Sequence, residues 1–140
     1  MGGDARYASP VARPQLRFRI DFSPRCSVGP GKIALLEAIE LTGSLSKAAR
    51  RQRMSYRRAW ELLASLNASF REPVVVTAIG GRGGGGARLT PLGKDLVSCY
   101  RAFEADAQAC AVRAFQEIAR KARRRAGAAA AAPVRRLGGR

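Results

Sequence analysis

The stretch from Ser44 to Phe70 reads SLSKAARRQRMSYRRAWELLASLNASF and predicts two short helices separated by a turn near Met54. Serine is a favoured N-cap, so Ser44 or Ser46 can begin the first helix and Ser55 the second. Residues at helical spacing form an apolar face on each helix. These faces consist of Leu45, Ala48 and Ala49, and of Ala59, Leu63, Leu66 and Phe70. Because small alanines let helices cross closely, the stretch predicts a helix-turn-helix.

Positive charge is concentrated in the first half of this stretch, which has six basic residues and no acidic one between Ser44 and Arg58. Recognition helices meet base edges near their amino ends, where arginine can bond guanine O6 and N7. For Trp60, burial in the core is an equally good interpretation, and a basic surface can also be merely solvated. The expected DNA-contacting residues here are Ser44, Ser46, Lys47, Arg53, Ser55, Tyr56, Arg57, Arg58 and Trp60.

The overall charge agrees with a polyanionic partner. The 140 residues carry a net charge of +16, and the pI is about 11.5. Nucleic acid is the first partner that such a charge favours, and an anionic membrane surface is the second. A coding bias toward Arg, Ala and Gly is the alternative explanation. The length allows one compact domain with a tail.

The composition argues against an enzyme, a metal site and a disulfide framework. There is no histidine to serve as a base or zinc ligand, and no paired carboxylates suggest a site. Three widely spaced cysteines, Cys26, Cys99 and Cys110, are typical of reduced thiols in a cytoplasmic protein. We expect no catalytic residue, no cofactor and no metal, and a cytoplasmic, nucleoid-associated location. The sequence has neither a signal peptide pattern nor an apolar run of the ~18 residues that a membrane span needs.

The residues before the stretch predict a strand and a helix. Residues 1–15 read as a flexible arm. Leu16, Phe18, Ile20 and Phe22 alternate with polar residues, which predicts a half-buried strand. The segment 24–31 reads as a turn or loop. A helix should follow from Pro30, a good first-turn residue, and should stop at Gly43.

The residues after the stretch predict a β wing. A β-rich run from Val74 to Ile79 precedes the glycine-rich segment GGRGGGGARLT, residues 80–90. Two short strands joined by this loop would let Arg82 and Arg88 contact the DNA backbone or minor groove. A plain flexible linker is the alternative. A phosphate-binding P-loop is a third interpretation, but no Gly-Lys-Ser/Thr follows the glycines.

A long helix capped by Thr90 should occupy residues 91–119. Its apolar residues have nearly heptad spacing, which predicts a seam for self-association. The predicted dimer contacts are Leu92, Leu96, Tyr100, Phe103, Ala107, Cys110 and Ala114, and Ile118 continues their spacing. Cys99 falls off this seam. Residues 120–140 read as a basic, disordered tail that would add salt-dependent affinity without sequence preference.

Several of these segments together carry a resemblance to a known family. They are MSYRRAW at 54–60, Leu66-Asn67, the wing segment with the PLG that follows it, GPGKIALL at 29–36 and TGSLSKAAR at 42–50. Together they resemble the N-terminal winged-helix domain of ModE-type, molybdate-responsive transcription regulators, which is related to the LysR-type helix-turn-helix. The resemblance covers roughly residues 16–115.

The resemblance implies a dimer that binds an inverted repeat in double-stranded DNA. It implies that Ser55, Tyr56, Arg57 and Arg58 read bases and that Arg82 and Arg88 are wing contacts. Full-length members continue into molybdate-binding domains, whereas this sequence ends in a basic tail. We therefore expect a free-standing member that does not sense molybdate itself.

The sequence thus predicts a mainly α fold with a small β wing: a winged helix-turn-helix at 16–90 and a long C-terminal dimerisation helix. The expected function is sequence-specific DNA binding by a bacterial transcription regulator. One alternative is a sequence-tolerant, nucleoid-type DNA binder. Another is an adaptor that partners an RNA or a protein such as a full-length homologue.

Overall fold

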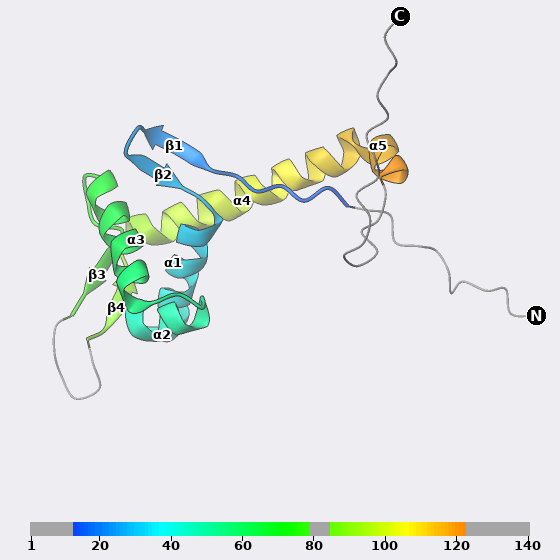
Figure 1. Ribbon diagram of the computed structural model, residues 1–140. Helices are drawn as coiled ribbons and strands as arrows, with labels where there is room; N and C mark the ends of the chain where they lie inside the picture. Colours follow the sequence, from blue (N-terminus) through cyan, green and yellow to red (C-terminus); the bar gives the residue numbers. More distant parts are fainter. Residues whose placement is uncertain (1–12, 79–84, 123–140) are drawn as a thin grey trace, which may run out of the picture.

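The computed structural model of the chain describes residues 13–78 and 85–122, to which every structural statement here is confined. Most of the expected N-terminal arm, the tip of the wing with Arg82, and the tail beyond residue 122 lie outside these ranges. The described residues form a small helical domain from which one long helix extends. Two short hairpins lie near the amino-terminal end of this helix (Figure 1).

The winged helix-turn-helix prediction is confirmed. Strand β3 pairs antiparallel with β4, with Val75 opposite Leu89 and Thr77 opposite Ala87, and this hairpin is the base of the wing. A second antiparallel hairpin is formed by β1 and β2. The elements are β1 (Ile20–Ser23), β2 (Cys26–Val28), α1 (Pro30–Thr42), α2 (Leu45–Arg51), α3 (Tyr56–Ser69), β3 (Val75–Thr77), β4 (Ala87–Leu89), α4 (Pro91–Ala114) and α5 (Gln116–Lys121).

Helix α1 provides the largest share of the core. It begins at Pro30 and ends before Gly43, whose φ of 64° is the left-handed conformation that glycine adopts without cost. The predicted inner faces of α2 and α3 are confirmed, except that Phe70 is only half-buried just after α3. The buried residues of the three helices are Ile33, Leu35, Leu36, Ala38, Ile39, Leu45, Ala48, Ala49, Ala59, Leu63 and Leu66.

The predictions for the N-terminal segment are only partly correct. Strand β1 is shorter than expected, because residues 13–19 are extended along α4 without pairing to a strand. The segment 24–31 is not all loop, since it contains strand β2. A two-residue turn at Pro24 lets the chain fold back at once, and Cys26 and Val28 are then buried beneath it. Alternation over only three residues was too short to indicate this strand.

The wing is fastened to α3 and α4 through the backbone of residues 73–75. Asn67 of α3 accepts hydrogen bonds from Val74 N–H (2.8 Å) and Val75 N–H (3.1 Å), and donates one to Val75 C=O (2.9 Å). Thr90 donates its hydroxyl proton to Pro73 C=O at 2.8 Å and caps α4 by accepting from the backbone N–H of its third residue. The wing therefore has a defined position on the helix-turn-helix.

Helix α4 is tied to α1 by an ion pair. Arg101 donates to both carboxylate oxygens of Glu37 at 2.7 Å and to Glu104 at 2.6 Å. The hydrogen bonds from Arg101 lower the pKa of Glu37 below its ordinary value. The prediction of one helix over 91–119 is wrong in detail, because α4 ends at Ala114 and α5 begins after Phe115. No glycine or proline marks this break in the sequence.

Gly93 is where α4 approaches the wing most closely, and it generates a stability prediction. A Cβ at Gly93 would lie 2.2 Å from Val74 C=O, whereas a Cβ at Gly31 would meet nothing within 4 Å. Gly93→Ala should lower the free energy of unfolding by about 1–3 kcal/mol through overpacking. Gly31→Ala, in the first turn of α1, should leave it unchanged or raise it slightly. Denaturant titrations would measure both, and equal stabilities would contradict the close packing.

Candidate nucleic-acid interface

Helix α2 is capped at both ends, and the cap at its carboxyl end forms the turn to α3. Ser44 is the N-cap of α2 and accepts from Lys47 N–H at 3.3 Å, so Ser44 rather than Ser46 begins this helix. At the other end, Arg53 N–H donates to Arg50 C=O and Met54 N–H donates to Ala49 C=O. These two bonds are a Schellman motif, with Arg53 in the left-handed position at a φ of 53°.

Helix α3 starts with its expected cap and presents its amino end to solvent. Ser55 accepts from Arg58 N–H at 3.1 Å. Tyr56, Arg57 and Arg58 are all exposed. Trp60 is 56% exposed, so the interpretation that placed it in the core is wrong. With a period of four residues, Tyr56 and Trp60 lie next to each other on one side of the helix.

A residue of this exposed face that the sequence analysis did not single out is Glu61. Its carboxylate accepts from Arg57 Nε at 3.1 Å and lies 3.9 Å from Arg58 Nη1. Together with Tyr56, Arg57 and Trp60 it lines a shallow depression on the exposed face of α3. Its position four residues after Arg57 was a usable signal, because such pairs face each other on a helix. A carboxylate here can orient Arg57 or accept from cytosine N4.

Around α3 the surface is strongly basic. Residues 41–60 contain no acid, and the exposed cations of this region are Lys47, Arg50, Arg51, Arg53, Arg57 and Arg58. Ser46 is also exposed, and Ser44 is half-buried by its capping role. On the wing, Arg88 is exposed in β4 opposite Val76, and Ala87 N–H bonds Gly43 C=O at 2.9 Å. The α1 end and the wing base therefore meet beside this basic surface.

The predicted dimer contacts on α4 are not all exposed in this chain. Tyr100 is buried and donates its hydroxyl proton to Phe18 C=O at 2.9 Å, so in this conformation it is unavailable to a second copy. Leu92, Leu96 and Ala107 are half-buried. Phe103 is 48% exposed although it makes an edge contact with Phe18. Cys110 and Ala114 are exposed, and Cys99 is exposed as well.

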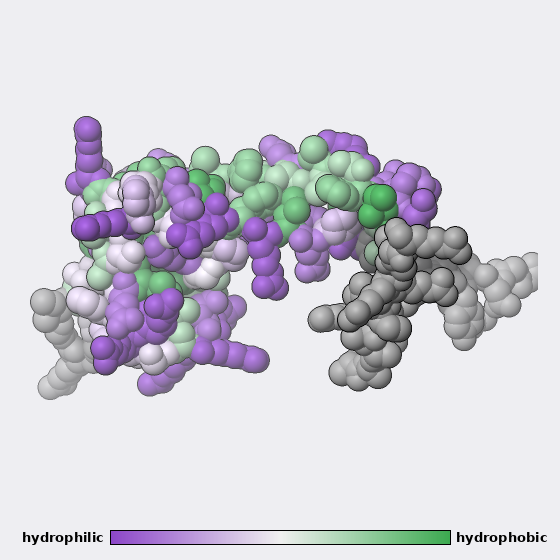
Figure 2. Space-filling view, turned by 45° about the horizontal axis from the view of Figure 1, so that its top comes forward, coloured by the Kyte–Doolittle hydropathy of each residue, from purple (hydrophilic) through white to green (hydrophobic). Residues whose placement is uncertain are grey.

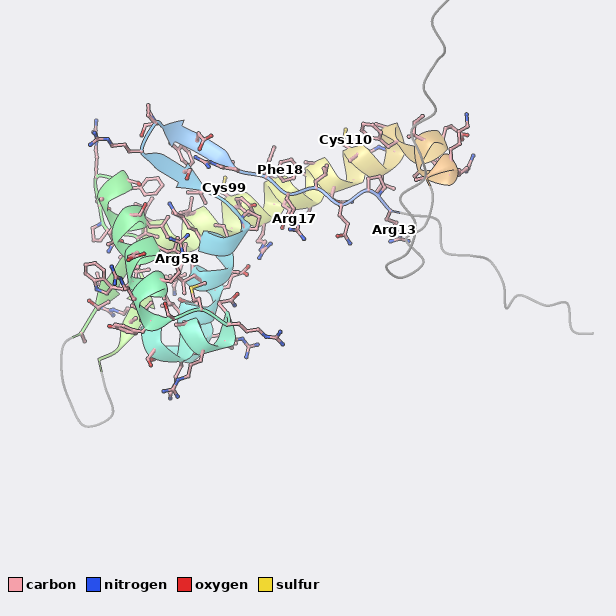
Figure 3. The ribbon with its side chains drawn as sticks, viewed as in Figure 1. Arg13, Arg17, Phe18, Arg58, Cys99 and Cys110 are labelled. Carbon is pink, nitrogen blue, oxygen red and sulfur yellow. The ribbon has the colours of Figure 1, made fainter. Side chains whose placement is uncertain are left out.

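An apolar strip therefore remains along one side of α4. Figure 2 shows apolar residues along the upper side of the long helix. Figure 3 places Cys99 and Cys110 along this upper edge of α4. Since residues three, four and seven apart share a helix face, Cys99 lies on the same strip as Phe103 and Cys110. The expectation that Cys99 falls off the seam is thus wrong, because Tyr100 turns inward and takes the core position.

Other kinds of site find no support in the described residues. No helix within 13–78 and 85–122 combines the length and the apolar character that a membrane span requires. In the same residues, no group of three or more His, Cys, Asp or Glu side chains is placed to hold a metal ion.

The capped helix pair, the exposed amino end of α3 and the wing define a winged helix-turn-helix domain. By sequence the chain is similar to ModE-type regulators over part of their length. It is 37% identical over 102 residues to the molybdenum transport protein ModE of Azotobacter vinelandii, which is 73% of this chain and 38% of that protein. It is 41% identical over 71 residues to the DNA-binding transcriptional dual regulator ModE of Escherichia coli K12, or 51% and 27% of the two chains.

A third relative bears a different name. The molybdenum-pterin-binding protein MopB of Rhodobacter capsulatus is 47% identical over 78 residues, which are 56% of this chain and 29% of that protein. No family model matches the chain. The chain spans about a third of the length of these relatives. None of the three bears an enzyme's name, in agreement with the expectation from the sequence.

Arg53, the left-handed residue in the turn, yields a prediction that distinguishes the effect of backbone strain on stability from the effect of its charge. The left-handed conformation costs a non-glycine residue about 1–2 kcal/mol, while glycine costs roughly 0.5–1 kcal/mol in chain entropy. Arg53→Gly should therefore raise the free energy of unfolding by about 0.5–1 kcal/mol. Arg53→Ala removes the same charge but keeps the strained backbone, so it should not stabilise. Thermal unfolding of both variants compares them, and equal midpoints would contradict strain at Arg53.

Proposed function

We propose that this chain is a sequence-specific DNA-binding transcription regulator that acts as a dimer on an inverted repeat. The observation that carries the proposal is the capped amino end of α3. There Tyr56, Arg57, Trp60 and Glu61 are exposed together, beside a turn that is rich in arginine and free of acids. Base-reading side chains at the start of a second helix are the arrangement by which helix-turn-helix proteins read the major groove.

In the proposed mechanism α3 enters the major groove with its amino end first. Arg57 donates to guanine O6 and N7, and Glu61 holds the guanidinium in place or accepts from a neighbouring cytosine. Tyr56 and Trp60 supply apolar contact, for example to a thymine methyl group. Ser55 and Arg58 are further base-reading candidates, as the resemblance implies. Phosphates are held by the other expected residues: Ser44, Ser46, Lys47, Arg53, and the wing residues Arg82 and Arg88. Such contacts fix the register of the protein on the duplex but do not choose the sequence.

We propose that a second copy covers the apolar strip of α4. Phe103, Cys110 and Ala114 are exposed on it, and Leu92 and Leu96 continue it toward the domain. Apolar residues in nearly heptad order along a helix are suited to pairing with a like helix. Two copies related by a two-fold axis would present two α3 helices to two half-sites, which is why an inverted repeat is the expected target.

The link to molybdenum is also a matter of proposal. One relative is named a molybdenum transport protein and another a molybdenum-pterin-binding protein. We propose that the chain binds its DNA without either ligand, because the exposed, basic amino end of α3 is formed by residues within 44–61 alone. In-vitro selection of DNA from a random pool, with and without molybdate, tests this and the specificity together. Selection without any enriched motif would favour the nucleoid-type alternative, and enrichment only with molybdate would refute ligand independence.

An adaptor role remains the alternative from a different class. The same apolar strip on α4 could bind a full-length homologue in place of a second copy. Co-purification of such a homologue, with no discrete DNA motif in the selection, would favour the adaptor.

The base-reading role of Arg57 predicts a difference between two DNAs. Arg57→Ala should weaken binding to the selected duplex by about 1–3 kcal/mol and binding to random duplex much less. Arg71→Ala is the control, because Arg71 is exposed just beyond the opposite end of α3. It should affect both duplexes equally and only slightly. Mobility-shift titrations measure these affinities, and equal losses on both DNAs for Arg57→Ala would refute base reading.

The proposed dimer can be tested with the protein's own thiols. Cys99 and Cys110 are exposed on the strip, whereas Cys26 is buried. A short bis-maleimide should therefore produce a covalent dimer that disappears in the Cys99→Ser/Cys110→Ser variant. Phe103→Glu should abolish the cross-link and shift the mass in solution from dimer to monomer, because it places a charge in the apolar strip. The matched control is Asp106→Glu on the same helix, and a monomeric unmodified protein would overturn the proposal.

A further inference from the structure

An extended segment, residues 13–19, is held along α4 by specific contacts. Gln108 of α4 donates its side-chain amide to Pro14 C=O and accepts from Leu16 N–H at 3.1 Å. Two residues after Leu16, Phe18 C=O accepts from the Tyr100 hydroxyl at 2.9 Å, and the Phe18 ring meets Phe103 edge-on at 5.0 Å. Contacts at both ends thus hold this segment in place although it belongs to no sheet.

The side chains of this segment alternate between α4 and solvent. Leu16 and Phe18 are half-buried, whereas Arg13, Arg17 and Arg19 are exposed. Arg19 bonds Asp21 at 2.7 Å. For Arg13 and Arg17, in contrast, the described part of the chain provides no ion pair or side-chain hydrogen bond. In extended backbone of about 3.3 Å per residue, these two positions are ~13 Å apart.

The two free arginines are on the side of α4 that faces the helix-turn-helix. Figure 3 shows Arg13 and Arg17 below α4, on the side where α1 and α2 lie, while Cys99 and Cys110 lie along the upper edge. Figure 2 likewise shows hydrophilic side chains projecting below the long helix. The arginines therefore extend the basic side of the domain away from α3 and leave the apolar strip uncovered.

We propose that Arg13 and Arg17 form a second DNA contact, which binds phosphates of the duplex beyond the bases that α3 reads. The proposal rests on the proposed DNA-binding function and adds a surface to it. Exposed arginines are suited to phosphate, which they bond in a bidentate manner. Because Gln108 and Tyr100 already hold the backbone, DNA would not need to order this segment, and less binding free energy would be lost.

This position predicts an affinity that depends on the length of the flanking DNA. Along α4 the two arginines lie far from the groove that α3 would occupy, so a duplex cut at the ends of the selected half-site would not reach them. A longer duplex would. The contact is to phosphate alone, and therefore the preferred sequence should be the same with or without it.

The experiment compares the double variant Arg13→Gln/Arg17→Gln with a control, Arg25→Gln/Arg71→Gln. The control removes the same charge from two exposed positions, at the β1–β2 turn and after α3. Each full-length protein is titrated with the selected half-site, on a duplex with long flanks on both sides and on one without flanks. On the long duplex, the Arg13/Arg17 variant should lose at least tenfold in affinity, and its salt slope should fall by about two, or roughly one per lost phosphate contact. On the short duplex it should bind like the control.

A second variant tests whether the fixed geometry matters. Gln108→Ala keeps every charge but removes both bonds to the segment, so it should lose part of the flank-dependent affinity and none of the sequence preference. Gln108 is thus a positioning residue. Equal behaviour of the Arg13/Arg17 variant and the control on both duplexes would overturn the proposal. If specific binding still depends on Arg57 in that case, the proposed function stands without the second contact. If the unmodified protein binds no DNA sequence specifically, both proposals are refuted.

Discussion

The backbone of residues 73–75 is the junction on which the arrangement of the interface depends. Asn67 of α3 satisfies Val74 and Val75 N–H, and the absence of a side chain at Gly93 lets α4 approach Val74 closely. Each such hydrogen bond contributes only about 1 kcal/mol, but an unpaired buried amide costs more. The position of the wing and the direction of α4 relative to α3 therefore follow from one short, fully bonded segment.

The parts of the fold that could be predicted from sequence are those in which local chemistry and periodicity agree. Ser44, Ser55 and Thr90 cap their helices as expected, because a hydroxyl at the N-cap satisfies the same orphan amides wherever it occurs. The parts that could not be predicted depend on partners distant in sequence. Tyr100 fits a heptad equally well facing inward or outward, and in the structure it packs in the core and bonds Phe18 C=O. In the candidate interface, Glu61 was not predicted, because only positive charge was taken as a sign of DNA contact. Glu61 is the acid that pairs with Arg57.

The pairing of Arg57 with Glu61 limits how the proposed interface would bind DNA. The Arg57 side chain is 89% exposed and that of Glu61 46%, and an exposed ion pair of this kind contributes little to stability. It does reduce the net charge at the centre of the reading face. Within residues 13–78 and 85–122, no carboxylate pairs with the surrounding cations Lys47, Arg50, Arg51 and Arg53. Attraction to any duplex would then come from the cations of α2 and the turn. Discrimination between sequences would come from Arg57 and Glu61, which can bond guanine and cytosine.

Helix α4 shows why these functions can coexist in so small a chain. Its inner side packs on α1 through Arg101 and Glu37, and a second side is covered by the segment from Arg13 to Phe18. The strip with Phe103 and Cys110 remains exposed. A second copy on that strip would leave Arg13 and Arg17 uncovered, since they project toward the other side of the helix (Figure 3). Pairing and phosphate binding would therefore use different surfaces, which meet where the Phe103 ring contacts Phe18.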